Sequence, residues 1–256
     1  MCTLLLAWQV DPARPLIVAA NRDEFYARPS APAAIWPRAS AADPEIVAGR
    51  DLQAGGTWLG VTRAGRFAAL TNVRELGVAT PPGAPSRGQL VADFLRGRDD
   101  PASYIAALRP ERYAGFNLVV GDRDALWYLS NRSGPARALG PGVYGLANAG
   151  LDTPWPKVRR GRAALAAQVA AGEVTGAALL ALLADRTPAP DAELPDTGVG
   201  LATERMLSPL LIASSGYGTC SSTALVIHRD GAVELHERSH NPARPGDASL
   251  TMSRGR

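Results

Sequence analysis

The order of the predicted strands and helices is the feature of this sequence that most restricts its fold. Five apolar, β-compatible runs lie within the first 72 positions, and then come two helices, more strands, two more helices and a final hairpin. Strict strand–helix alternation would predict a parallel sheet, whereas segregated runs predict antiparallel sheets with helices packed outside them. We therefore expect an α+β fold, a four-layer αββα sandwich with two helices over each of two mainly antiparallel sheets.

The first two predicted strands form a hairpin. Both runs are apolar without clean alternation, so we expect both of their faces to be covered. A polar loop at 21–45 should follow, and then a meander of three short strands. The strand predictions are 3–10 and 16–20 for the hairpin, and 46–50, 57–62 and 67–72 for the meander.

Helix signals appear after this first group of strands. Ser86 and Gln89 have the spacing of a capping box, and Asp100 with Pro101 makes an N-cap and first-turn pair. Helices are also expected at 157–171 and 174–184, and a loop at 186–200. The remaining strand predictions are 116–121, 125–130, 143–148, 223–228 and 233–237. The polar tail from about residue 239 is expected to fray.

Composition and charge limit the class of protein. The 256 residues, 46% of them hydrophobic, suit a single domain over 1–256. Two cysteines exclude a disulfide scaffold and a zinc site of the usual Cys₄ or Cys₂His₂ kind, and no metal site is expected. The net charge is +3 without a long run of like charges, which argues against a nucleic-acid partner. The basic cluster at 157–162 is expected to be a solvated helix face.

Targeting and membrane signals are not expected in this chain. No stretch approaches 18 apolar residues, and the apolar run at 3–10 is too short for a signal segment. We therefore expect a cytoplasmic protein without a membrane span and with reduced thiols. Its oligomeric state is left open.

Cys2 is the most informative single residue. Removal of Met1 would place an α-amine and a thiol on Cys2, and such an amine, with a pKa of about 7.7–8.0, can serve as the base. In the predicted hairpin the start of the first strand lies beside the end of the second, where Arg22 would lower the thiol pKa. Asp23 or Glu24 would orient the α-amine. The alternative for Cys2 is a chance cysteine at the start of a strand. The alternative for the Asn-Arg-Asp-Glu segment at 21–24 is a solvated charged loop.

Six sets of motifs resemble the NRDE family, also called the transport and Golgi organisation protein 2 family. They cover nearly the whole chain. They are Met-Cys-Thr at 1–3, Asn-Arg-Asp-Glu at 21–24, Gly-Arg-Asp at 49–51 with Gly-Gly-Thr-Trp-Leu-Gly at 55–60, Leu-Thr-Asn-Val-Arg at 70–74, Gly-Leu-Ala-Asn at 145–148 with Leu-Asp-Thr-Pro-Trp-Pro-Lys at 151–157, and Tyr-Gly-Thr at 217–219.

The resemblance implies the N-terminal nucleophile hydrolase fold and a site similar to that of cysteine amidohydrolases that cleave bile salts and penicillin V. Carried over, Cys2 matches their nucleophile and Arg22 the arginine beside the thiol. Asn72 and Asn148 match two asparagines near the reacting carbonyl, where an amide N–H stabilises the oxyanion. Turn formation at strand ends is the alternative role for both asparagines.

Two positions depart from these patterns. The hydrolases place an aspartate three residues after the arginine, where this chain has Phe25, while Asp23 directly follows Arg22. Many members of the family have arginine after Tyr-Gly-Thr, where this chain has Cys220. Cys220 is expected to be a buried small residue.

Two function hypotheses follow. The first is a Cys2-dependent amidohydrolase that acts on a small amide and requires no cofactor. The alternative is a non-catalytic protein that binds haem or an acyl-CoA-like lipid in the same cleft, through Cys2 or a histidine as haem ligand or through arginines that hold phosphates. The candidate ligand-binding residues are Arg22, Glu24, Arg50, Trp58, Arg74 and Cys220, with His228, His236 and His240 as further haem-ligand candidates.

Overall fold

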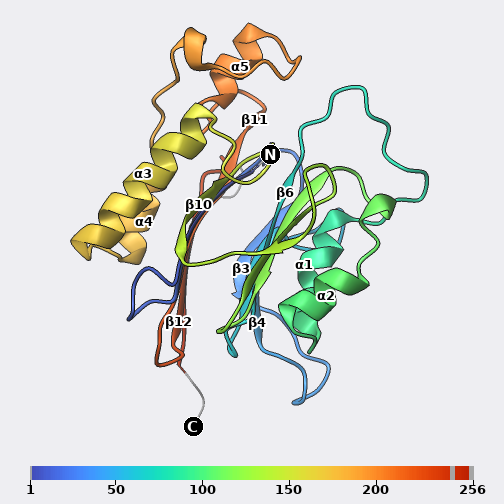
Figure 1. Cartoon of the computed structure of the whole chain (residues 1–256), viewed down its shortest axis with the longest axis vertical. Helices are drawn as coiled ribbons and strands as arrows, with labels where there is room; N and C mark the ends of the chain where they lie inside the picture. The colour runs from blue at the N-terminus through green and yellow to red at the C-terminus, as the bar shows by residue number, and fades with distance from the viewer. Residues whose placement is uncertain (1, 243–245, 254–256) are drawn as a thin grey trace.

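The computed structural model describes residues 2–242 and 246–253, and in these ranges the strands form two antiparallel sheets that face each other (Figure 1). The first sheet has the order β10-β1-β2-β11-β12-β13. Its strands are β1 (Cys2–Trp8), β2 (Leu16–Phe25), β10 (Gly142–Leu146), β11 (Tyr217–Ile227), β12 (Val233–Ser239) and β13 (Gly246–Met252).

The second sheet has the order β3-β4-β5-β6-β7-β8-β9, so the expected meander at 46–72 is confirmed. The expected polar loop at 21–45 is wrong in part, because β2 continues to Phe25 and the next segment pairs with β4 as an edge strand. The strands are β3 (Ser30–Ile35), β4 (Ile46–Asp51), β5 (Leu59–Thr62), β6 (Phe67–Asn72), β7 (Phe116–Gly121), β8 (Leu126–Ser130) and β9 (Arg137–Ala138).

Helices cover the outer face of each sheet. Two of them pack on the first sheet and two on the second, as Figure 1 shows, which confirms the four-layer αββα arrangement. A further short helix within the described ranges, α5, was not expected. The helices are α1 (Arg87–Arg96), α2 (Pro101–Ala107), α3 (Pro156–Ala171), α4 (Gly176–Leu183) and α5 (Leu201–Leu207), with 3₁₀ turns η1 (Pro110–Arg112) and η2 (Asp191–Glu193). No helix within those ranges has the length and apolar character needed to cross a bilayer.

Alternation along β1 shows how one sheet serves two cores. Leu4 and Leu6 are buried between the two sheets, whereas Leu5 and Ala7 are buried against α3 and α4. A third core lies between the second sheet and α1. Burying a leucine contributes about 1.5–3 kcal/mol, so the apolar hairpin stabilises two layers at once.

Local expectations had mixed outcomes. Asp100 caps α2 by accepting a hydrogen bond from the Ser103 N–H at 2.9 Å, as expected. The capping box is wrong, because the Ser86 side chain makes no cap hydrogen bond. The frayed tail from about residue 239 is also corrected, since β13 pairs with β12 as the edge of the first sheet. Residues 243–245 and 254–256 of that tail lie outside the described ranges.

Candidate functional site

The β1–β2 hairpin places Cys2 directly opposite Arg22. The register pairs these two residues, which confirms the expected neighbourhood. Both lie in phase with the residues that face the second sheet, such as Leu4 and Val18, so both side chains belong to the space between the sheets. The site is therefore built at one end of the inter-sheet core.

The Asn-Arg-Asp-Glu segment at the end of β2 sends its side chains to two faces. Asn21 and Asp23 follow the helix-facing phase of the strand, and the Asn21 Nδ2 donates to the Leu183 carbonyl at 3.1 Å, at the end of α4. Arg22 and Glu24 follow the phase that faces the second sheet. Asn21 thus anchors the strand to the helix layer, while the other three residues line the cavity at Cys2.

Arg22 is held by an aromatic ring and an acid. Its guanidinium lies 4.4 Å from the Trp58 ring centroid, and its Nη2 is 3.9 Å from the Asp51 Oδ2. Gly49 makes room for this ring, since a Cβ there would lie 2.5 Å from a Trp58 ring carbon. The glycine of Gly-Arg-Asp and the tryptophan of Gly-Gly-Thr-Trp therefore cooperate to fix the arginine beside Cys2.

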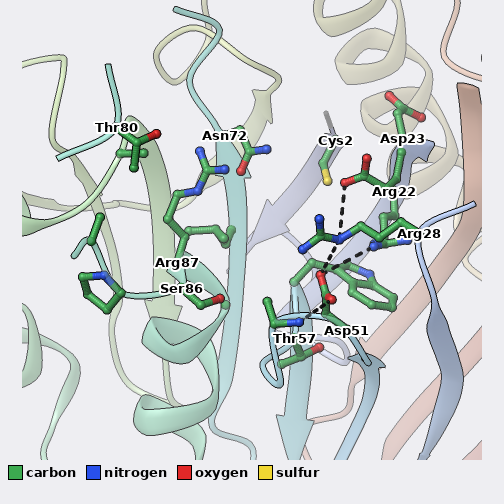
Figure 2. Close-up of a pocket in the computed structure, with 18 residues that line it drawn as sticks. Cys2, Arg22, Asp23, Arg28, Asp51, Thr57, Asn72, Thr80, Ser86 and Arg87 are labelled. Atoms are coloured by element: carbon green, nitrogen blue, oxygen red, sulfur yellow. Dashed lines mark hydrogen bonds and ion pairs between the residues drawn. The ribbon is translucent and has the colours of Figure 1, made fainter. Parts of the chain in front are cut away.

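A cavity of about 290 Å³ opens at Cys2 between the sheets (Figure 2). This volume lies at the small end of ligand pockets, which span about 300–1,000 Å³. In the figure, Cys2 and Asn72 lie across the cavity from each other. The lining includes Cys2, Arg22, Asp23, Glu24, Arg28, Asp51, Trp58, Asn72, Ser86 and Arg87.

Asp23 forms a buried ion pair with Lys157, the residue that begins the first turn of α3 after Pro156. The Asp23 Oδ1 accepts a hydrogen bond from the Thr219 hydroxyl at 2.7 Å, and its Oδ2 lies 3.9 Å from the Lys157 Nζ. Burial raises the pKa of the Asp23 carboxyl, and the Lys157 cation opposes that rise. Burial likewise lowers the pKa of Lys157, against the attraction of Asp23.

Lys157 is a site residue that the sequence reasoning missed. The cluster at 157–162 was expected to be solvated, but the Lys157 side chain is only 2% exposed. The signal in the sequence was its rarity, because it is the one lysine among 27 Lys and Arg residues. It also closes the Leu-Asp-Thr-Pro-Trp-Pro-Lys motif, which places it where α3 meets the end of β2.

The Cys2 thiol is less acidic than expected. Burial raises its pKa and outweighs the opposing effects of the Arg22 cation and the Asp23 backbone N–H. Arg22 does act to lower the thiol pKa, as expected, but removal from water penalises the thiolate more than Arg22 stabilises it, so the pKa lies above its usual value.

The two asparagines have different places. Asn72 ends β6 and lines the cavity. Asn148 is buried outside the lining, and its Nδ2 donates to the Asn72 carbonyl at 2.8 Å. The structure therefore brings Asn72 to Cys2, while Asn148 positions the Asn72 backbone.

Three further candidates lie away from the Cys2 cavity. The Arg50 guanidinium lies 4.7 Å from the Trp36 ring centroid. Arg74 pairs with the buried Glu204, with its Nη1 2.9 Å from a carboxylate oxygen. Cys220 is buried, as expected, at a bulge where β11 pairs with β2, and it lines a second cavity that shares Trp58 with the first. The bulge re-aims the residue that follows Tyr-Gly-Thr.

Two further arginines, Arg28 and Arg87, line the Cys2 cavity and were not predicted from the sequence. The Arg28 Nε donates to Asp51 at 2.8 Å, and the Arg87 Nη1 donates to the Gly115 carbonyl at 2.8 Å. Arg28 follows β2 and Arg87 begins α1, so nothing in their local sequence indicated a shared cavity.

The histidines have partners elsewhere. The His228 Nε2 lies 3.0 Å from the Glu234 Oε1, and the His236 Nε2 lies 3.7 Å from the Oε2 of the same glutamate. The two histidines are therefore near each other, as expected. His240 Nε2 and the Ser222 hydroxyl are 2.8 Å apart. None of the three histidines is among the residues that line the Cys2 cavity.

The layers and the position of Cys2 define a protein with the N-terminal nucleophile hydrolase fold. The structure resembles that of the C2A mutant of conjugated bile acid hydrolase from Clostridium perfringens, with a TM-score of 0.56 and 8% identity over 98% of this chain and 92% of that one. Likeness at this identity shows the fold alone.

The sequence relatives identify the family. The model of the Transport and Golgi organisation 2 family matches residues 1–242. The Transport and Golgi organization protein 2 homologue of Bos taurus is 36% identical to this chain over 262 residues, which cover 93% of each protein. The homologue of Homo sapiens has the same identity and coverage. The Drosophila melanogaster protein is 28% identical over 276 residues, covering 93% of this chain and 92% of its own. The chain belongs to the Transport and Golgi organisation 2 family.

Proposed function

We propose that this protein is a hydrolase of small amides in which Cys2 is the N-terminal nucleophile. The observation that carries the proposal is the meeting of Cys2, Arg22, Asp23 and Asn72 at one cavity within this fold. Cys2 and Arg22 come from a hairpin of the first sheet, and Asn72 comes from the second. A substrate held between the sheets would contact Cys2, Arg22 and Asn72, with Asp23 directly behind them.

The proposed reaction begins after removal of Met1. The α-amine of Cys2 takes the thiol proton, and the sulfur attacks the amide carbonyl. Asn72 lies across the cavity, where its amide N–H would stabilise the oxyanion. Collapse breaks the C–N bond, the α-amine returns the proton to the leaving nitrogen, and water then hydrolyses the thioester.

Asp23 and Lys157 support this step without touching the substrate. The Asp23 carboxylate would accept a hydrogen bond from the protonated α-amine and so orient it. Lys157, 3.9 Å from the Asp23 Oδ2, favours the ionised carboxylate in a buried setting. Both residues are therefore positioning residues in the proposal.

A second candidate function is binding without bond cleavage. The feature that favours it is the burial of the Cys2 thiol, which raises the pKa of that thiol, since a neutral thiol is a poor nucleophile. The ligand would be haem or an acyl-CoA-like molecule, with its head in the cavity at Cys2. Haem titration of the wild type and of Cys2→Ala tests this candidate, and no spectral change at micromolar haem would remove its haem form.

Hydrolysis of small acyl p-nitroanilides tests the first proposal, because cleavage releases a coloured amine. We expect turnover by the wild type, none above background by Cys2→Ala, and unchanged turnover by Cys220→Ala, the matched control. Equal rates for wild type and Cys2→Ala would refute the proposal.

Both cysteines are free thiols, which fits the cytoplasmic setting that we propose.

A further inference from the structure

The N-terminal end of α1 faces the Cys2 cavity. Ser86, Arg87 and Gly88 are all part of its lining. Gly56 packs against this turn, since a Cβ there would lie 2.4 Å from the Gly88 carbonyl carbon, and only glycine permits that approach. The backbone N–H groups at a helix start carry partial positive charge and favour anions. The Gly-Gly-Thr motif therefore holds a positive helix end against the cavity.

Arg87 adds a full charge at the same place. It makes no ion pair with any residue in the described ranges, whereas Arg28 is bound to Asp51 at 2.8 Å. Partial burial lowers the pKa of the Arg87 guanidinium, which nevertheless stays charged near neutral pH. Figure 2 shows Arg87 beside Asn72, on the side of the cavity opposite Cys2.

Arg22 supplies a third, independent donor. Its side chain is only 5% exposed, and its Nη1 has no hydrogen-bond partner within the described residues. A buried charged donor without a partner carries a large desolvation penalty. A ligand oxygen in the cavity would remove that penalty.

The carboxylates of the lining do not cancel these charges at Arg87. Asp51 accepts hydrogen bonds from Arg28 and from backbone N–H groups that follow it in the chain. Asp23 is engaged by Thr219 on the helix-facing side of β2. Glu24 accepts the N–H of the residue after it. The cavity therefore presents positive groups on the α1 side and engaged acids on the other.

We propose that the Cys2 cavity binds a carboxylate, with Arg87 as its principal ligand and the start of α1 and Arg22 as further donors. Resting on the proposed function, the amide cleaved at Cys2 would then be a small amide that carries a carboxylate. The planar guanidinium matches the two oxygens of a carboxylate. A cavity of about 290 Å³ suits a small acid.

Alkylation of Cys2 tests the anion site without requiring turnover. Iodoacetate carries a carboxylate where iodoacetamide carries a neutral amide. Peptide mass spectrometry measures the fraction of Cys2 that each reagent has modified. We expect the iodoacetate-to-iodoacetamide rate ratio at Cys2 to exceed that of free cysteine. Arg87→Gln should lower it by about 10- to 150-fold, the effect of losing a hydrogen bond to a charged group. Arg123→Gln, at an exposed turn, should leave it unchanged.

Protection of Cys2 against alkylation in the wild-type protein keeps the test valid if a variant folds poorly. We expect N-acetylglycine to slow Cys2 alkylation by iodoacetamide more than equal ionic strength of sodium chloride does. A ratio equal to that of free cysteine, or an unchanged ratio in folded Arg87→Gln, would overturn the anion site. Stronger protection by inorganic phosphate than by N-acetylglycine would overturn the carboxylate assignment. Failure of p-nitroanilide hydrolysis alone would overturn only the proposed reaction.

Discussion

The buried Lys157–Asp23 pair gives a prediction whose size follows from its geometry. The Nζ and the Oδ2 are 3.9 Å apart, and both side chains are almost fully buried. Lys157→Met keeps the apolar stem but leaves the Asp23 charge without its cation. Removing one partner of a buried pair costs about 3–5 kcal/mol, so we expect that loss in the free energy of unfolding at pH 8.

The loss should shrink as the pH falls. Burial already raises the pKa of Asp23 in the folded state, so its stabilising contribution is present below the unfolded pKa and is lost as the pH rises through the folded pKa. Removal of the Lys157 cation moves the folded pKa further up. The lowered pKa of Lys157 acts in the same sense, because the wild type loses stability as the pH falls through it. We therefore expect the loss in the free energy of unfolding to be smaller at pH 5 than at pH 8.

Urea unfolding followed by tryptophan fluorescence at pH 5 and pH 8 measures both values. Arg159→Met is the matched control, since Arg159 lies two residues further along α3 in an exposed pair with Glu193, and we expect a change within about 0.5 kcal/mol. The double variant Lys157→Met with Asp23→Asn should recover part of the loss. A loss below about 1 kcal/mol at pH 8, or equal losses at both pH values, would refute the buried-pair reasoning.

Three further predictions use the same unfolding assay. Asn21→Leu should destabilise by about 1–3 kcal/mol for each backbone carbonyl left unpaired, and a neutral result would contradict the anchoring role. Gly49→Val should cost about 1–3 kcal/mol and shift the fluorescence of Trp58; an unchanged spectrum and midpoint would show that the ring is not confined there. Burial raises the pKa of Glu237, so wild-type stability is lost as the pH rises through that pKa, and Glu237→Gln should flatten the curve between pH 5 and pH 8. Equal slopes for the two proteins would rule out that contribution.

The four-layer fold was predictable because local sequence patterns indicate most of its strands and helices. The unalternating apolar runs of the first hairpin required cover on both faces, and the register of Cys2 against Arg22 followed from the hairpin length. The edge strands β3 and β13 were not predictable in the same way. Their largely exposed residues show little regular alternation, and pairing with β4 and β12 makes them strands.

The candidate site was predictable where the first hairpin joins its residues, or where the family resemblance indicates a role, as for Asn72. Cys2, Arg22 and Asp23 come from one hairpin, but Lys157 and Arg87 come from helices whose docking decides what they meet. Burial of Lys157 depends on the acid it pairs with across the fold. The direction of the Cys2 pKa also escaped the sequence, because desolvation depends on the second sheet and not on the neighbouring charge alone.

The proposed nucleophile is tested most directly by the mass of the N-terminal peptide of the purified protein. An α-amine on Cys2 is needed to take the thiol proton, so we expect a peptide that begins at Cys2 and, after brief mixing with an acyl p-nitroanilide, a fraction that carries the acyl group on its thiol. Retention of Met1 on most chains, with no acyl adduct on Cys2, would contradict the proposal.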